Sequence, residues 1–268
     1  MLLVYSKEHL PHTRAVKNAA YNVLSLARWW GDKRTADVTA LNCRAYAEAR
    51  TPSAARRDLQ TLQAAIGYWH KHYGPLPALP AVVMPPAEQP RERWLTRQEV
   101  ARLLRAARQC SPYLVRMILI GFYTGSRLRV ILRTEWSWID LEQGLMLRRA
   151  PGTTETRKRT PPVRIGHRLL AHLRRWRRLD DPRCPYVCHR DGRLINGPHH
   201  SWRKAVRLAG LDSDVTPHAL RRTRATRGMQ QKVDPWQLAG HLGMNLQTLL
   251  RVYGKHSPDH QKDAANFK

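Results

Sequence analysis

The stretch Thr-Pro-His-Ala-Leu-Arg-Arg-Thr at residues 216–223 reads as the start of a helix. Thr216 is suited to capping that helix and Pro217 to its first turn, where a missing N–H removes no hydrogen bond. His218 and Arg221 are three residues apart, so both side chains lie on one face of the helix near its amino-terminal end. Free backbone N–H groups and the positive end of the helix dipole attract phosphate there. The stretch therefore predicts an anion-binding helix end that carries an imidazole and a guanidinium.

Two further short segments carry reactive side chains. Residues 124–127, Thr-Gly-Ser-Arg, combine a helix stop with an immediate helix start, which places Arg127 at a sharp corner. A guanidinium fixed in this way is suited to binding a phosphate through two parallel hydrogen bonds. Residues 249–254 place Tyr253 on the last turn of a short amphipathic helix, directly before a glycine. From this position we expect a mobile, exposed phenol.

The charge of the chain indicates a polyanionic partner. The sequence has 47 Lys and Arg against 20 Asp and Glu, a formal net charge of +27. The excess is uneven, because residues 1–90 hold 11 basic and 6 acidic residues and the remainder holds 36 and 14. Nucleic acid is the leading partner, bound most strongly by the second part. Codon bias in a GC-rich genome is the weaker explanation of so many arginines.

Several classes of protein are disfavoured by what the sequence lacks. The first residues have no sustained apolar core of a signal peptide, and no segment approaches the roughly 18 apolar residues of a membrane span. The 4 cysteines are too few for a disulfide framework. No GxxxxGK[ST] motif for binding nucleotide triphosphate is present. We expect a soluble, cytoplasmic protein that contacts no membrane.

Helical periodicity and a proline-rich segment predict two domains. Apolar residues recur at helical spacing over 15–30, and two more helices are expected after Thr39 and after Ser53, the last closed by Gly74. Residues 75–90 contain six prolines and predict an extended linker. The predicted division is a helical DNA-binding domain at 1–75, a linker at 76–93 and a second domain at 94–268.

The second domain is predicted to be mainly helical with a small antiparallel sheet. Thr96 and Glu99 have the spacing of a capping box, and a further helix begins at 111–112 and ends near Gly125. Short apolar runs at 138–139, 145–147 and 163–165 predict the sheet. The remaining predicted elements are helices at 169–176, 202–209, 217–229, 235–242 and 246–253, with a loop or hairpin at 180–198.

The order of these motifs resembles the tyrosine recombinases of the phage integrase family. The features that carry the resemblance are TGxR at 124–127, a hairpin with a basic tip, HxLR at 218–221, a Gly-His or Gly-Met turn, here Gly243-Met244, and a tyrosine near the carboxyl terminus. The resemblance extends to residues 14–74, which look like the family's helical, SAM-like core-binding domain. It implies a mainly α fold with a small antiparallel β-sheet in an α+β catalytic domain, and two domains that form a clamp around DNA.

The resemblance also implies roles for particular residues. It makes Arg127 and Arg221 the arginines that bind the scissile phosphate, and Tyr253 the nucleophile. His218 becomes a general base or hydrogen-bonding partner between them. The family uses a hairpin lysine as general acid, and Lys158 is the only lysine between Leu145 and Ile165, so it is assigned by elimination.

Two positions depart from the family's pattern. The family often has Glu or Asp three residues after its first arginine, whereas this chain has Val130, so the support of that carboxylate must come from elsewhere. The family commonly has His or Trp nine residues before the tyrosine, and here that residue is Met244. His241, one helical turn earlier, is the alternative, and Lys255 and His256 are further candidates.

The implied function is site-specific DNA recombination or integration through a covalent 3′-phosphotyrosine, without ATP, a metal or any other cofactor. The implied partners are double-stranded DNA and three further copies of the chain in a homotetramer. The resemblance also implies a protein that is associated with the bacterial nucleoid or encoded by a phage. The alternatives are an impaired integrase that only binds DNA, a type IB topoisomerase and an RNA-binding protein. Cys184, Cys188 and His189, with His199 and His200 downstream, permit a zinc site, but the spacing is not a standard one.

Overall fold

A computed structural model describes residues 1–13, 16–88, 92–153 and 160–266. The chain forms two compact units, residues 1–91 and residues 92–268. Each unit has its own hydrophobic core. The predicted fold class, mainly α with a small antiparallel sheet, is confirmed. No helix among the described residues is long and apolar enough to cross a membrane.

The first unit is built on three helices that pack around apolar side chains. They are α2 (Val16–Trp30), α3 (Ala40–Glu48) and α4 (Pro52–His72), and Thr39 caps α3 as predicted. A buried carboxylate, Asp58, joins two of them, because it accepts hydrogen bonds from Tyr46 and Arg50 of the α3 segment. Short helical turns also precede α2, which the sequence pattern did not predict: α1 (Leu2–Val4), η1 (Tyr5–His9) and η2 (Leu10–His12).

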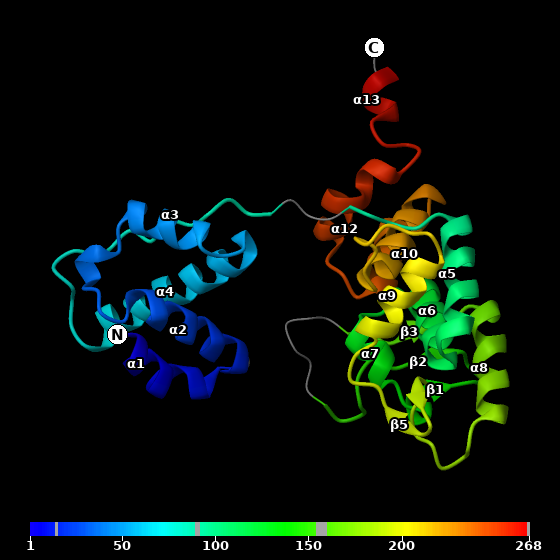
Figure 1. The fold of residues 1–268 in the computed structure, drawn as a ribbon. Coiled ribbons are helices and arrows are strands. Elements are labelled where there is room, and N and C mark those ends of the chain that lie inside the picture. Colours follow the sequence, from blue (N-terminus) through cyan, green and yellow to red (C-terminus); the bar gives the residue numbers. More distant parts are fainter. Residues whose placement is uncertain (14–15, 89–91, 154–159, 267–268) are drawn as a thin grey trace. The chain divides into compact units, whose positions relative to one another are not determined.

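The second unit is a helical body with two small sheets at its periphery (Figure 1). Its helices have the following bounds: α5 (Arg97–Cys110), α6 (Pro112–Thr124), α7 (Leu128–Arg133), α8 (His167–Leu179), α9 (His199–Leu208), α10 (His218–Gln230), α11 (Pro235–Leu242), α12 (Leu246–Tyr253) and α13 (Lys262–Asn266). The predicted capping box at the start of α5 is confirmed, with Thr96 and Glu99 each bonded to the other's backbone N–H.

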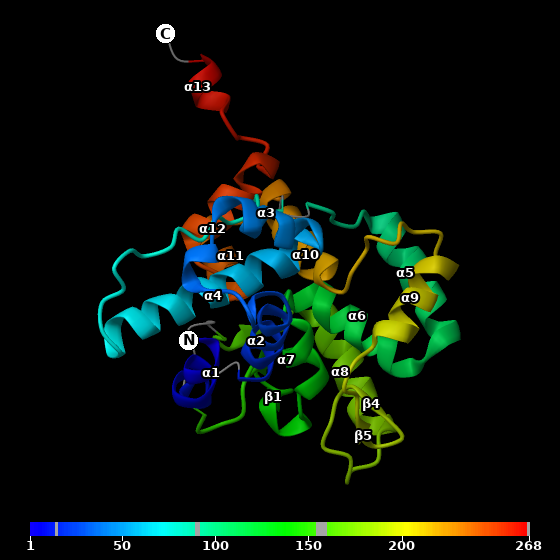
Figure 2. The ribbon, with the colours of Figure 1, turned by 60° about the vertical axis from the view of Figure 1, so that its left-hand side comes forward.

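The apolar helix α6 forms the centre of this unit. It contacts α5, α7, α8 and α10, and most of its side chains are buried. Helices α10, α11 and α12 pack on one another at one end of the unit, while the two-stranded hairpin at residues 189–194 lies at the other (Figures 1 and 2). The arrangement brings the ends of α6 and α11 together with the start of α10.

The three-stranded sheet has the order β1-β2-β3 and is antiparallel throughout. Its strands are β1 (Ile139–Asp140), β2 (Leu145–Met146) and β3 (Val163–Arg164), and Met146 lies opposite both Ile139 and Val163. The second sheet is the hairpin of β4 (His189–Arg190) and β5 (Arg193–Leu194), at the position where the sequence allowed a loop or a hairpin.

Candidate active site

The amino-terminal end of α10 carries two of the predicted site residues. The helix begins at His218, one residue later than the sequence pattern placed it, and Pro217 is its N-cap residue. Arg221 is only 4% exposed, and its Nη1 donates to the carbonyl of Gly125 at 2.8 Å and to that of Leu242. The second predicted arginine of the phosphate site is therefore a buried cation that links the ends of α6 and α11.

The corner that carries Arg127 has the predicted geometry. Helix α6 ends at Thr124, Gly125 adopts a left-handed conformation with φ of 62°, and Arg127 is the N-cap residue of α7. A Cβ atom on Gly125 would lie 2.4 Å from Cδ2 of Leu242, so the corner packs directly on the end of α11. Only glycine satisfies both the backbone conformation and this close approach.

Tyr253 ends α12 as predicted, but the expectation of an exposed phenol was wrong. Its side chain is 7% exposed and packs in a cluster with buried residues of α10, α11 and α12 such as Met229 and Leu249. The amphipathic face of α12 continues through its last turn, which explains this burial. Burial raises the pKa of the phenol, and the nearby guanidiniums of Arg222 and Arg221 oppose that rise.

Electrostatic interactions connect four of the predicted site residues. The pKa of His218 is lowered to about 4, first by burial and then by the positive charges of Arg222, Arg221 and Arg127. Burial also lowers the pKa of Arg221 to about 10, with further contributions from Arg127 and, in the opposite direction, Tyr253. The fold thus brings Arg127, His218, Arg221 and Tyr253 together. At neutral pH the imidazole is uncharged, so one ring nitrogen donates a hydrogen bond and the other can accept a hydrogen bond or a proton.

His241 and Met244, the two candidates for the family's His or Trp position before the tyrosine, occupy different environments. Nε2 of His241 lies 3.3 Å from the carbonyl oxygen of Tyr123, and burial lowers the pKa of this imidazole to about 4. Met244 packs against the cluster that contains Tyr253. Both residues line a hollow of about 900 Å³ beside residues 161–164.

The remaining candidates do not join this group through contacts in the described part of the chain. Lys158 lies outside the described residues. Lys255 pairs with Glu92 at 2.6 Å, and the ring of His256 stands edge-on to Trp94. Both contacts connect the segment after Tyr253 to the beginning of the second unit.

Sequence reasoning missed Arg148 and Arg222. Arg148 is 5% exposed, and burial followed by the charges of Arg221 and Arg127 lowers its pKa to about 9. One signal could have found it, because Arg148 follows the buried Met146 by two residues, and a strand pattern that continued past Met146 would place both side chains on the inward face. Arg222 interacts with both His218 and Tyr253.

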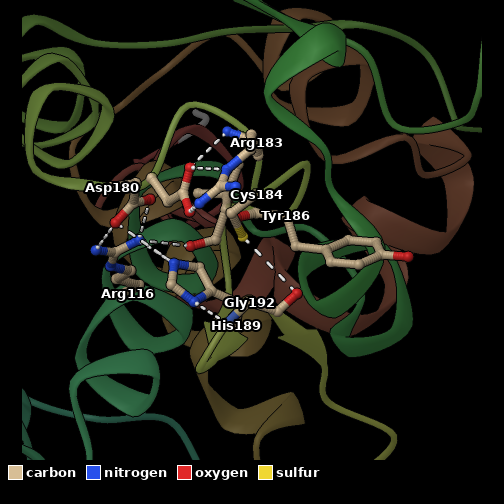
Figure 3. Close-up of polar contacts among 9 residues, drawn as sticks. Arg116, Asp180, Arg183, Cys184, Tyr186, His189 and Gly192 are labelled. Atoms are coloured by element: carbon tan, nitrogen blue, oxygen red, sulfur yellow. Dashed lines mark hydrogen bonds and ion pairs between the residues drawn. The ribbon is translucent and has the colours of Figure 1, made fainter.

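A second polar group lies in the loop between α8 and β5, where it contacts α6 (Figure 3). Asp180 accepts two hydrogen bonds from Arg116 of α6, at 2.6 and 2.7 Å, and lies 3.4 Å from Nε2 of His189. The backbone N–H of Gly192 donates to Nδ1 of His189, so the neutral ring carries its proton on Nε2, toward Asp180. These contacts anchor the loop to α6.

The cysteines considered for zinc belong to this loop. The thiol of Cys184 contacts the carbonyls of Tyr186 and Gly192, and burial raises the pKa of Cys188 to about 12. The described residues contain no group of three or more His, Cys, Asp or Glu side chains arranged to hold a metal ion.

Comparisons with known proteins define the class of this fold. It is similar to a lambda integrase dimer bound to a core site, with a TM-score of 0.76 and 16% identity over 94% of this chain and 75% of that chain. It is also similar to the Tn1549 transposon integrase in complex with transposon right-end DNA, with a TM-score of 0.75 and 16% identity over 98% and 99%. For the XerH recombinase bound to a palindromic difH substrate the TM-score is 0.71, with 17% identity over 94% and 79%. At this identity the likeness shows the fold.

The sequence itself shows the family. The profile of the phage integrase family matches residues 93–260, well over half of the chain. No curated protein sequence matches it. The chain belongs to the phage integrase family and is a tyrosine recombinase in sequence and fold, as its motifs predicted.

Proposed function

We propose that this chain is a site-specific recombinase or integrase that cleaves and rejoins DNA strands through a covalent 3′-phosphotyrosine at Tyr253, without ATP or a metal. The observation that carries the proposal is the convergence of Tyr253, Arg221, Arg127 and His218 in one electrostatic neighbourhood. Family membership and a net charge of +27 support duplex DNA as the substrate.

The chemistry follows from these residue types. The phenol oxygen of Tyr253 attacks the phosphorus, a new P–O bond to tyrosine forms, and the bond to the 5′ oxygen breaks. Negative charge gathers on the nonbridging oxygens, where the two guanidiniums stabilise it. The energy of the phosphodiester is kept in the phosphotyrosine, so the reverse attack by a 5′-hydroxyl reseals a strand with no further energy source.

Proton transfer completes the proposed cycle. Tyr253 must lose its proton as it attacks, and His218 is assigned as its acceptor or hydrogen-bonding partner because the imidazole is neutral at pH 7. The departing 5′ oxygen must gain a proton, and Lys158 is the candidate donor. Met244 and His241 are the candidates for a further contact to the phosphate.

The finer parts of the proposal concern assembly. The two units are proposed to clamp duplex DNA, and four chains are proposed to join two DNA sites in a homotetramer. Proteins of similar fold that were solved with DNA, among them a lambda integrase dimer on a core site, support duplex DNA as the partner.

The test begins with covalent capture, because the target sequence is unknown. The full chain is incubated with a library of nicked duplexes of random sequence, and DNA that survives denaturing purification on the protein is sequenced. We expect enrichment of a defined site by the wild-type chain and no covalent DNA with Tyr253→Phe. Equal DNA binding by both proteins with no adduct in either would favour the alternative of an integrase-derived protein that only binds DNA.

A second candidate, a type IB topoisomerase, uses the same covalent chemistry on a single duplex. Relaxation of supercoiled plasmids that lack the captured site would favour it. Exchange of strands only between two plasmids that both carry the site would favour the recombinase.

A further inference from the structure

The carboxyl-terminal turn of α11 has its carbonyls divided between backbone and arginine donors. The final four carbonyls of a helix have no partner inside it. Those of Ala239 and Gly240 accept from the N–H groups of Met244 and Gly243, because Gly243 adopts a left-handed conformation with φ of 61°. The next carbonyls accept from side chains of distant segments.

Three arginines supply those side-chain donors. Nη2 of Arg148 donates to the carbonyl of His241 at 2.7 Å, and Nη1 of Arg221 donates to that of Leu242. Nη2 of Arg127 makes a longer contact of 3.5 Å to the carbonyl of Gly243. The carbonyls of three consecutive residues, 241–243, thus each face one arginine. They lie at the carboxyl-terminal end of α11, where the helix dipole is negative.

Arg148 binds the end of α6 as well as the end of α11. Its Nη2 also donates to the carbonyl of Thr124 at 2.8 Å, and its Nε donates to Oγ of Ser126 at 3.0 Å. Ser126 in turn accepts a hydrogen bond from Thr124 and is followed directly by Arg127. One planar guanidinium therefore fixes the backbone of the Arg127 corner against the turn that also holds Arg221.

The hydrogen bonds of Arg148 favour a supporting role over direct contact with the phosphate. Its Nε and Nη2 are committed to the ends of α6 and α11, and its Nη1 is buried without a hydrogen-bond partner in the described structure. A buried guanidinium with an unpaired donor is expensive in free energy, so its geometry must be enforced by the surrounding packing. The charge remains close enough to interact with both Arg221 and Arg127.

We propose that Arg148 is a positioning residue for strand cleavage, which holds the Arg127 corner on the end of α11 so that Arg127 and Arg221 bind one phosphate together. This inference rests on the function proposed above. It also accounts for the absence of the family's Glu or Asp at position 130, where this chain has Val130. The carbonyls at the end of α11 supply the negative partner of the three arginines instead.

The test compares Arg148→Lys and Arg148→Met with Arg149→Lys and Arg149→Met. Arg149 is exposed and adjacent, so these controls change the same charge at nearly the same place. The measurements are the single-turnover rate of adduct formation at saturating captured duplex, the Kd for that duplex, and thermal unfolding with and without inorganic phosphate.

Lysine keeps the charge but cannot donate to Thr124, Ser126 and His241 in one plane. We expect Arg148→Lys to bind the duplex within about 3-fold of wild type. Its rate of adduct formation should fall about 100-fold, as expected for a misplacement of about 1 Å at the reacting group. Both Arg149 variants should keep the wild-type rate. Adduct formation by Arg148→Lys at the wild-type rate would overturn the inference, and it remains testable if Arg148→Met fails to fold.

Failure of the proposed function has a different signature. If the wild-type chain forms no adduct, the phosphate measurement still tests the placement of the arginines. Phosphate should raise the unfolding temperature of wild type and of the Arg149 variants, because it binds the folded cluster. It should raise that of Arg148→Lys much less. An equal rise in all of them would overturn the positioning role without reference to cleavage.

Discussion

Arginines at two places in the second unit meet different kinds of negative partner. Arg116 meets a carboxylate, Asp180, with which it forms two hydrogen bonds. Arg148 and Arg221 meet backbone carbonyls, which carry only partial charges. The first arrangement satisfies its own charge, whereas the second keeps an excess of positive charge. The difference separates an ion pair that anchors a loop from a cluster that is suited to receive an anion.

The largest effect is expected when a charge is removed from the group of arginines that contains Arg148 and Arg221. Arg221→Ala should reduce adduct formation by about 10³-fold or more, because a preorganised donor to the phosphate is lost. Salt-dependent DNA binding should survive, since other basic residues supply most of it. Single-turnover cleavage and a DNA titration measure the two effects. Arg178→Ala, at an exposed position of α8, is the control for loss of one charge. Normal cleavage by Arg221→Ala contradicts the assignment.

Removing the carboxylate from the Arg116–Asp180 ion pair should lower stability and leave strand cleavage largely unchanged. Asp180→Asn leaves the charge of Arg116 buried without a counter-ion and should lower the free energy of unfolding by about 3–5 kcal/mol. Urea unfolding measures the change. The double variant with Arg116→Met and Asp180→Leu should be more stable than Asp180→Asn, since no unpaired charge remains. Equal instability of the two would show that the ion pair is not the reason.

The corner between the two helix ends offers a smaller change. Gly125→Ala should lower the free energy of unfolding by about 1–3 kcal/mol, since its φ of 62° is strained for alanine and the new methyl meets Leu242. Gly152→Ala is the matched control, with φ of 78° and no atom within 4 Å of the added Cβ. Thermal unfolding of both separates the strain of φ from the contact. Equal losses would mean that the approach to Leu242 is unimportant.

The histidines near the cluster predict how stability depends on pH. The folded-state pKa values of His218 and His241 are lowered to about 4, whereas an unfolded histidine titrates near ~6.5. The unfolded chain therefore binds more protons in this window, and the free energy of unfolding should fall as pH drops from about 6.5 to 4. Urea unfolding across the window should show a shallower slope for His218→Gln than for wild type. An unchanged slope would mean that His218 is not held neutral.

The smallest expected effect is that of Tyr253→Phe on stability. The ring packs in an apolar cluster, and within the described chain its hydroxyl makes no hydrogen bond to another residue. The free energy of unfolding should change by less than about 1 kcal/mol, although adduct formation is lost. A large loss of stability would indicate that the phenol has a structural role, and the capture experiment would then need a second nucleophile control.

Local signals predicted the elements that carry the site. Gly125 after an apolar run, Thr96 with Glu99, and the periodicity that ends at Tyr253 each depend on neighbours within a few residues. The residues that the sequence missed depend on long-range contacts. Arg148 lies in the segment after β2 and meets Thr124 and His241, which are 24 and 93 residues away along the chain, and the burial of Tyr253 depends on α10 and α11. A local pattern carries no information about such partners.

The carbonyls at the end of α11 have a genetic consequence. A counter-ion that is a side chain can be lost by a single codon change, whereas a backbone carbonyl is present in every residue type. The substitution that can withdraw these acceptors is one that changes the path of the chain, and Gly243, with φ of 61°, is where the path turns. The side chains at 241, 242 and 244 can vary without removing an acceptor from the arginines. The packing of Leu242 and the candidate roles of His241 and Met244 still constrain these side chains, but the acceptors themselves depend on Gly243.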